Sequence, residues 1–120
     1  MCLIMGLKEF KDTRQDSSGL RKRWFSASGL ELFCWSDQLG EVQRIEIIWE
    51  ESSQKRLWTW SMGEAGKFYE LDEGDSDPRK NLSQLAVDEH DGDYELLLTM
   101  IEGNSGELPY EVMDTLRMLA

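Results

Sequence analysis

Hydrophobic and polar positions alternate along the chain up to residue 71, in short segments that turn residues separate. Four such segments are rich in β-branched and aromatic side chains: residues 30–36, 42–50, 55–61 and 67–71. A shorter segment that begins at Arg23 precedes them. Alternation of this kind is typical of half-buried strands joined by hairpins. The pattern therefore predicts an antiparallel sheet of four or more strands, arranged as a meander.

The turn after residue 36 predicts how the first long hairpin is paired. Asp37 is favoured at the start of a type I turn, and Gly40 supplies the left-handed residue of a three-residue loop. If Asp37 pairs with Glu41, then Phe33 faces Ile45 across the hairpin. Odd-numbered residues of both strands then share one face.

Charge predicts the register of the next hairpin. Pairing Glu50 with Lys55 places opposite charges side by side, and Ile47 then faces Trp58. The two registers together place Glu31 on one face with seven large apolar side chains: Phe33, Trp35, Ile45, Ile47, Trp49, Trp58 and Trp60. The other face is charged at its centre and apolar at its edges: Leu30, Leu32, Cys34, Val42, Arg44, Glu46, Ile48, Leu57 and Thr59.

The hydrophobic period becomes helical near the end of the chain. The stretch from Asp91 carries four apolar side chains at i, i+3, i+4 and i+7: Tyr94, Leu97, Leu98 and Ile101. Acidic residues lie at its start, where they suit the helix dipole, and Gly103 follows its end. A second helix begins at Pro109 and presents one apolar side: Val112, Met113, Leu116 and Leu119. The short connection predicts an antiparallel helical pair.

Strands that come first and helices that come last indicate the α+β class. We predict an antiparallel sheet followed by a C-terminal helical hairpin that packs on one face and covers its large apolar side chains. Residues 1–19 lack periodicity, and we expect them to form an N-terminal arm before a single domain of residues 20–120. Residues 72–81 are polar and predict a loop, whereas the apolar run 82–87 fits either a strand or a helical turn.

The net charge of the 120-residue chain is concentrated in its second half. Twenty-four acidic residues against thirteen Lys and Arg give a formal net charge of −11, and the whole excess lies after residue 60. This composition argues against nucleic acid as a partner, because such binding depends on neutralising phosphates. It argues against an anionic membrane surface for the same reason. An acidic half instead favours a basic protein as partner, or self-association.

Two cysteines are too few for a disulfide framework. Cys34 lies in an apolar run and is expected to behave as a buried hydrophobe, although a disulfide to Cys2 is an open alternative. A reducing compartment is the simpler interpretation. The apolar stretch 1–5 is too short for a signal peptide or a membrane span, so we expect a cytoplasmic protein.

Several short motifs recur together in a known group of proteins. Arg23-Trp24-Phe25, the strand Leu57-Trp58-Thr59-Trp60 and the C-terminal Leu108-Pro109 stand in that order. In this respect residues 21–119 resemble a group of small uncharacterised bacterial proteins. The motifs are short and hydrophobic, which points to shared core packing. The resemblance implies no activity and no site residue.

No residue pattern in the sequence specifies a catalytic site. The single histidine, His90, is surrounded by acids, which favour imidazolium over a general base. The polar loop contains weak oxygen ligands for a hard cation at Asp72, Asp75 and Asp77, without the spacing of a calcium loop. We predict no cofactor, and we favour a non-enzymatic protein.

Three functions agree with these features. The first is a protein–protein interaction or adaptor domain with an acidic C-terminal half. The second is a module that binds a small apolar ligand in a cavity lined by tryptophan, and the third is an acidic mimic of nucleic acid. The candidate binding residues are Trp35, Trp49, Trp58, Trp60 and Glu31, because Trp is enriched in ligand cavities and at interface hot spots.

Overall fold

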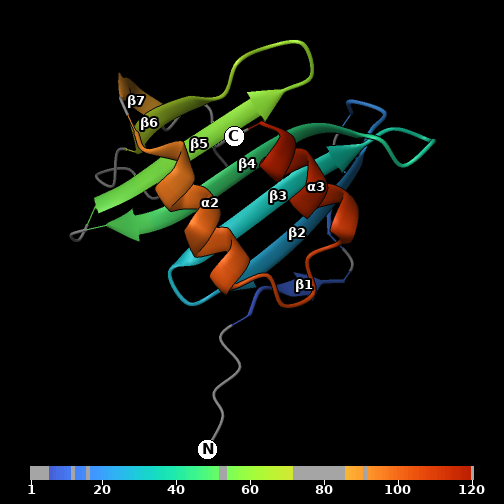
Figure 1. Ribbon diagram of the computed structural model, residues 1–120. Helices are drawn as coiled ribbons and strands as arrows, with labels where there is room; N and C mark the ends of the chain where they lie inside the picture. Colours follow the sequence, from blue (N-terminus) through green and yellow to red (C-terminus); the bar gives the residue numbers. More distant parts are fainter. Residues whose placement is uncertain are drawn as a thin grey trace, which may run out of the picture.

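A computed structural model describes residues 6–11, 13–15, 17–51, 54–71, 86–90 and 92–119. Within these residues, seven strands form one antiparallel sheet in which each strand pairs with the next along the chain (Figure 1). The strands are β1 (Lys8–Phe10), β2 (Arg21–Ala27), β3 (Leu30–Ser36), β4 (Val42–Glu51), β5 (Gln54–Ser61), β6 (Lys67–Leu71) and β7 (Ala86–His90). Helices α2 (Tyr94–Gly103) and α3 (Tyr110–Met118) follow. The predicted α+β meander is confirmed.

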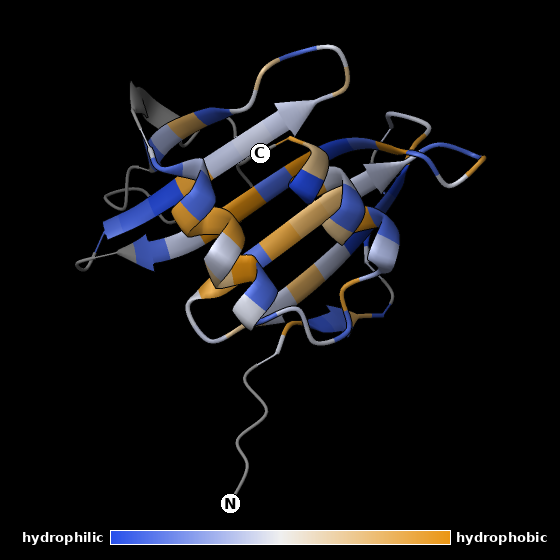
Figure 2. Cartoon of the chain, viewed as in Figure 1, coloured by the Kyte–Doolittle hydropathy of each residue, from blue (hydrophilic) through white to orange (hydrophobic). Residues whose placement is uncertain are grey.

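Both helices cover the same face of the sheet (Figure 1). Hydrophobic positions gather in the middle of the strands beneath them and on the sides of the helices that face the sheet (Figure 2). The core has two layers. The sheet contributes fully or almost fully buried side chains that include Phe25, Leu32, Ile45, Ile47 and Trp58, and the helices contribute Leu97, Ile101, Val112 and Leu116. The arrangement confirms a helical layer packed on one face.

The register of β4 and β5 is the predicted one. Glu50 pairs with Lys55, and Ile47 pairs with Trp58. Side chains of these two strands therefore alternate between the helical layer and the opposite face as expected. Trp49 lies on the helical side with Ile47, because the two residues are two positions apart on one strand.

The turn between β3 and β4 is also the predicted one. The Asp37 amide donates to the carbonyl of Glu41 at 2.9 Å, and Gly40 has a φ of +83°. The Asp37 carboxylate accepts from the amides of Leu39 and Glu41, both at 2.9 Å. The loop is thus closed by the turn chemistry that its sequence indicates.

A β-bulge directly after this turn makes the predicted register of β3 and β4 wrong by one residue. Ser36 pairs with Val42, but Trp35 pairs with Arg44, so Gln43 is an extra residue on β4. The carbonyl of Gln43 accepts from the Met62 amide at 2.8 Å, which keeps this polar group paired. A bulge of this kind reverses which face the following side chains occupy.

The bulge reverses the predicted faces of residues 30–35 of β3. Phe33 pairs with Glu46 instead of Ile45, and Glu31 pairs with Ile48. Phe33, Trp35 and Glu31 therefore lie on the face away from the helices. Leu30, Leu32 and Cys34 lie in the core instead, and all three are buried.

Residues of the expected N-terminal arm, residues 1–19, contribute to the sheet and the core. Lys8–Phe10 forms β1 against β2, and Leu7 is fully buried. The Leu7 amide donates to the Asn104 carbonyl at 2.8 Å, and the Glu107 amide donates to the Leu7 carbonyl at 2.8 Å. The segment between α2 and α3 is therefore tied to the start of the chain.

The helix boundaries differ slightly from the predicted ones. Asp93 caps α2 by accepting from the Leu96 amide at 3.2 Å, so the helix begins after Asp93 instead of at Asp91. Gly103 is the last residue of α2 instead of the residue that follows it. Leu119 lies past the end of α3 and is 36% exposed, although it was expected on the apolar side.

Candidate functional site

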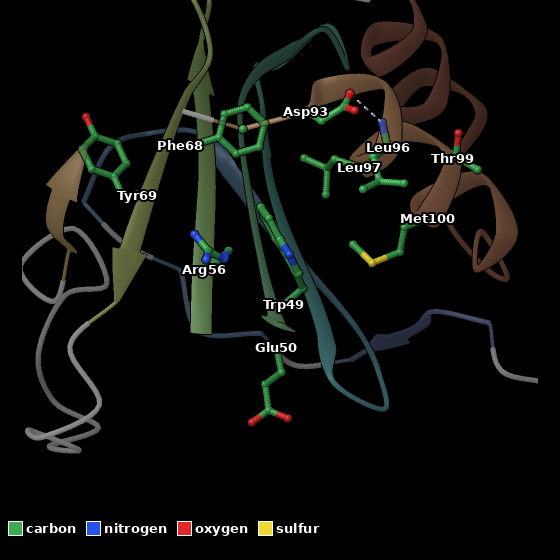
Figure 3. A pocket seen from close by; sticks show the side chains of 11 residues that line it. Trp49, Glu50, Arg56, Phe68, Tyr69, Asp93, Leu96, Leu97, Thr99 and Met100 are labelled. Carbon is green, nitrogen blue, oxygen red and sulfur yellow. Dashed lines mark hydrogen bonds between the residues drawn. The ribbon is translucent and has the colours of Figure 1, made fainter. Parts of the chain in front are cut away.

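A pocket of about 510 Å³ lies between α2 and the strands β4, β5 and β6 (Figure 3). We call it the α2 pocket. Its lining residues are Trp49, Glu50, Arg56, Phe68, Tyr69, Gly92, Asp93, Leu96, Leu97, Thr99 and Met100. The volume falls within the range of small-molecule sites, which are concave and mainly apolar.

Two aromatic rings form the sheet side of the α2 pocket. Trp49 comes from β4 and Phe68 from β6, and both are partly buried. Their ring centroids are 6.1 Å apart and their planes meet at 89°. This edge-to-face arrangement is favoured between aromatic rings, and it forms a corner between the two side chains.

Aliphatic side chains of α2 form the opposite side. Leu97 is 4% exposed and points toward the sheet, whereas Leu96 is 65% exposed at the rim (Figure 3). Met100 lies one turn after Leu96, on the same side of the helix, and is partly buried. An aromatic side and an aliphatic side therefore face each other across the pocket.

The backbone of Gly92 closes one end. A Cβ atom placed on Gly92 would lie 2.4 Å from Cδ1 of Phe68, so no larger residue fits beside this ring. Asp93 follows directly and caps α2. The start of the helix and the position of the Phe68 ring are therefore fixed together.

The charged groups of the α2 pocket lie at its edges. Arg56 forms an ion pair with Glu70, with 3.5 Å between Nη1 and Oε1. The Glu50 side chain points away from the cavity (Figure 3). Asp93 faces the pocket from the beginning of α2. Apolar contact is thus the main interaction that the interior offers.

Of the five tryptophan and glutamate candidates, the structure brings only Trp49 to this pocket. Trp58 and Trp60 are 2% and 6% exposed and belong to the core. The Trp58 ring packs against Tyr94, with centroids 5.1 Å apart. These two tryptophans are therefore part of the packing between the sheet and the helices.

The other two candidates lie on the opposite face. Trp35 is covered by two cations: Lys22 Nζ lies 5.4 Å and Arg44 Cζ lies 4.9 Å from its ring centroid. Glu31 is on the same face, two residues before Phe33. The expected common cluster of Trp35 and Glu31 with the other tryptophans is therefore wrong, because the bulge separates them.

The sequence pattern does not single out the residues of α2 and β6 that line the pocket. The pattern places Phe68 on a strand without indicating a role, and Leu96 and Met100 lie outside the apolar stripe that predicts the helix. Their spacing at i and i+4 was the available signal, since it marks a second apolar side of α2.

Among the residues that the structure describes, no candidate metal site forms. Within these ranges, no three His, Cys, Asp or Glu side chains are close enough to hold a metal ion. The weak metal candidates Asp72, Asp75 and Asp77 lie outside the described residues. The described segments also contain no helix with the length and apolar character needed to cross a membrane.

Cys34 and Tyr94 are unsuited to acid–base or nucleophilic chemistry near neutral pH. Burial raises the pKa of the Cys34 thiol to about 11, and this side chain is 1% exposed. Burial also raises the pKa of Tyr94 to about 12, and its hydroxyl donates to the Leu116 carbonyl at 2.6 Å. Both groups stay protonated, so they act in packing.

Comparisons with protein families, with curated proteins and with solved structures find no match for this chain. The resemblance to small bacterial proteins therefore stays a prediction, and function is argued from the site alone.

Proposed function

We propose that the protein binds a small, largely apolar molecule in the α2 pocket. The observation that carries this proposal is a 510 Å³ pocket with Trp49 and Phe68 on one side and Leu97 and Met100 on the other. All four residues lie on strands or a helix, and binding sites on such elements are held more precisely than sites on loops. We propose this role for a cytoplasmic protein, as the free thiol of Cys34 favours.

Incomplete burial of the lining side chains supports a ligand at this position. Trp49 and Met100 are only partly buried, and Leu96 is 65% exposed. Large apolar side chains that share one concave surface gain stability when another apolar group removes them from water. A ligand with an apolar body of a few carbon atoms supplies such a group.

Tryptophan fluorescence tests the proposal. Titration with 1-octanol should change the emission of the native protein, and Trp49→Phe should remove most of this response. Trp24→Phe is the matched control, because Trp24 lies on β2 and stacks between Phe10 and Phe33 on the other face. An equal response in both variants would show that octanol binds elsewhere.

A pair of methionine variants tests the same site without changing a fluorophore. Met100→Gln places a polar amide in the pocket and should weaken octanol binding about tenfold. Met118→Gln makes the same chemical change on α3, where the side chain is 78% exposed. Equal affinities of these two variants would contradict the proposed site.

A protein partner is the second candidate, and exposed apolar side chains on α3 favour it. Tyr110 is 72% exposed and Met118 is 78% exposed. Self-association is the simplest form of this function. Sedimentation equilibrium of the native protein should then show dimers that the double variant Tyr110→Ser, Met118→Ser lacks, and a monomer at all concentrations would exclude self-association.

A further inference from the structure

We infer that the ligand of the α2 pocket carries an alkylated ammonium group next to its apolar body, and that this group binds in the corner formed by Trp49 and Phe68. The inference rests on the proposed function, because it names the chemical class of the molecule that the pocket binds. It joins two observations: the geometry of the aromatic corner and the sign of the charges around it.

The corner provides the contacts that an alkylated ammonium group prefers. Trp49 and Phe68 stand at 89° to each other with centroids 6.1 Å apart. A cation within about 6 Å of a ring centroid is attracted by the negative face of the ring, and Trp attracts it most strongly. Methyl groups on the nitrogen also contact the rings as apolar groups and need no hydrogen-bond acceptor. Right-angled aromatic sides therefore suit such a cation better than they suit a hydroxyl or a carboxylate.

The charges around the corner favour a cation. Asp93 faces the pocket, whereas the Glu50 side chain points away from it (Figure 3). Arg56, the one basic residue among the described lining residues, has Glu70 as an ion-pair partner, which offsets its charge. Asp93 and Glu95 together offset the partial positive charge at the start of α2.

The long-range electrostatic field around the pocket is also negative. Residues 61–120 contain the whole excess of acidic residues, and both α2 and Phe68 belong to this part of the chain. A field of this sign raises the local concentration of cations and disfavours anions. The aliphatic side of the pocket, Leu97 and Met100, is left for the apolar body of the ligand.

Three probes with the same alkyl chain separate these contributions: octyltrimethylammonium, 1-octanol and octanoate. We expect isothermal titration calorimetry to give the tightest binding for the ammonium compound, about fivefold tighter than octanol. Octanoate should bind most weakly. Raising the NaCl concentration from about 20 to about 200 mM should weaken only the ammonium compound, since screening acts on charges.

A charge-neutral variant locates the effect. Asp93→Asn removes a charge but keeps a residue that caps helices well, so α2 should be retained. It should weaken octyltrimethylammonium about threefold more than it weakens octanol. Glu111→Gln is the control, because it makes the same change in net charge on α3 and is remote from the lining residues. Trp49→Leu should abolish the preference for the ammonium compound, and Trp49→Phe should reduce it.

The outcomes distinguish this inference from the proposed function. Equal binding of ammonium and alcohol, or tighter binding of octanoate, would overturn the inference and leave the apolar site in place. Equal effects of Asp93→Asn and Glu111→Gln would also overturn it. Failure of all three probes to bind would overturn the proposed function and the inference with it.

Discussion

Gly92 is packed directly against the ring of Phe68, and this contact shapes one end of the α2 pocket. A Cβ atom on Gly92 would lie 2.4 Å from Cδ1 and 2.5 Å from Cγ of Phe68. We therefore expect Gly92→Ala to displace the ring and to weaken octanol binding at least fivefold. Overpacking of this kind costs about 1–3 kcal/mol, which urea unfolding would measure.

Gly103→Ala is the matched control for this prediction. Gly103 is the last residue of α2, and a Cβ atom placed on it has no heavy atom within 4 Å. Alanine favours helix over glycine, so this variant should keep or slightly raise the unfolding free energy. Octanol affinity should equal that of the native protein. A Gly92→Ala protein that binds octanol as tightly as Gly103→Ala would contradict the role assigned to Phe68.

The connection between α2 and α3 approaches the start of the chain too closely for a side chain at position 106. Gly106 has a φ of +44°, and a Cβ atom on it would lie 2.4 Å from the Leu7 carbonyl oxygen. We expect Gly106→Ala to lower the unfolding free energy by about 3 kcal/mol, through backbone strain and loss of the hydrogen bonds at Leu7. Urea unfolding followed by circular dichroism measures this change.

The variant Gly63→Ala separates the cost of backbone strain from the cost of the close approach to Leu7. Gly63 also has a positive φ, +85°, but a Cβ atom there meets nothing within 4 Å. This variant should therefore show only the conformational cost of about 1–2 kcal/mol. Equal losses for Gly63→Ala and Gly106→Ala would mean that the close approach to Leu7 adds nothing.

The fold was largely predictable from sequence because each strand has a local pattern. The segments at 30–36 and 67–71 coincide with β3 and β6, and the turn closed by Gly40 forms as expected. The bulge at Gln43 was not predictable in this way. The Gln43 carbonyl accepts a hydrogen bond from the amide of Met62, which lies in the turn after the next strand.

The site was less predictable than the fold, because it forms between elements that are distant in sequence. Trp49 is a candidate because the predicted register places it on the aromatic face of the sheet. Its neighbours Phe68 and Met100 become lining residues only because α2 crosses the sheet at this position. Burial of Leu7 has a similar origin, since its hydrogen-bond partners are Asn104 and Glu107. Pairings over such distances have no signature in local periodicity.

A bidentate ion pair joins β1 to β2 and should contribute measurably to stability. Arg23 donates to both carboxylate oxygens of Glu9, at 2.6 and 2.7 Å, and these side chains are only 27% and 26% exposed. We expect Glu9→Gln to lower the unfolding free energy by about 1 kcal/mol. Glu102→Gln is the control, because Glu102 makes a single contact to Arg117 and both are more exposed. It should cost less than about 0.5 kcal/mol.

Lowering the pH should remove the stabilisation that Glu9 provides through its ion pair with Arg23. The hydrogen bonds from Arg23 hold the pKa of Glu9 below its usual value in the folded protein. The stabilisation is therefore present above the unfolded pKa and is lost as the pH falls through the folded pKa. The difference between the native protein and Glu9→Gln should shrink on acidification. A constant difference would show that the ion pair contributes nothing through charge.

We expect the buried thiol of Cys34 to lower the unfolding free energy of the protein in alkaline solution. Burial raises its pKa from 9.0 to about 11 in the folded protein. A raised folded pKa gives stability that is complete below the unfolded pKa and is lost as the pH rises through the folded pKa. The window therefore lies between pH 9 and 11, and the loss from this group amounts to about 2–3 kcal/mol.

Urea unfolding of two proteins isolates this contribution. The first carries only Cys2→Ser, and the second carries Cys2→Ser together with Cys34→Ala. The alanine variant starts from a lower stability because it leaves a small cavity beside Ile45 and Arg23, the residues that pair with Cys34. The difference between the two proteins should be constant below pH 9 and should narrow toward pH 11. The remaining ionisable groups are the same in both proteins, so their contributions cancel in the comparison. Two parallel curves would mean that the thiol ionises without hindrance in the folded protein, and the burial of Cys34 beneath the helices would then be contradicted.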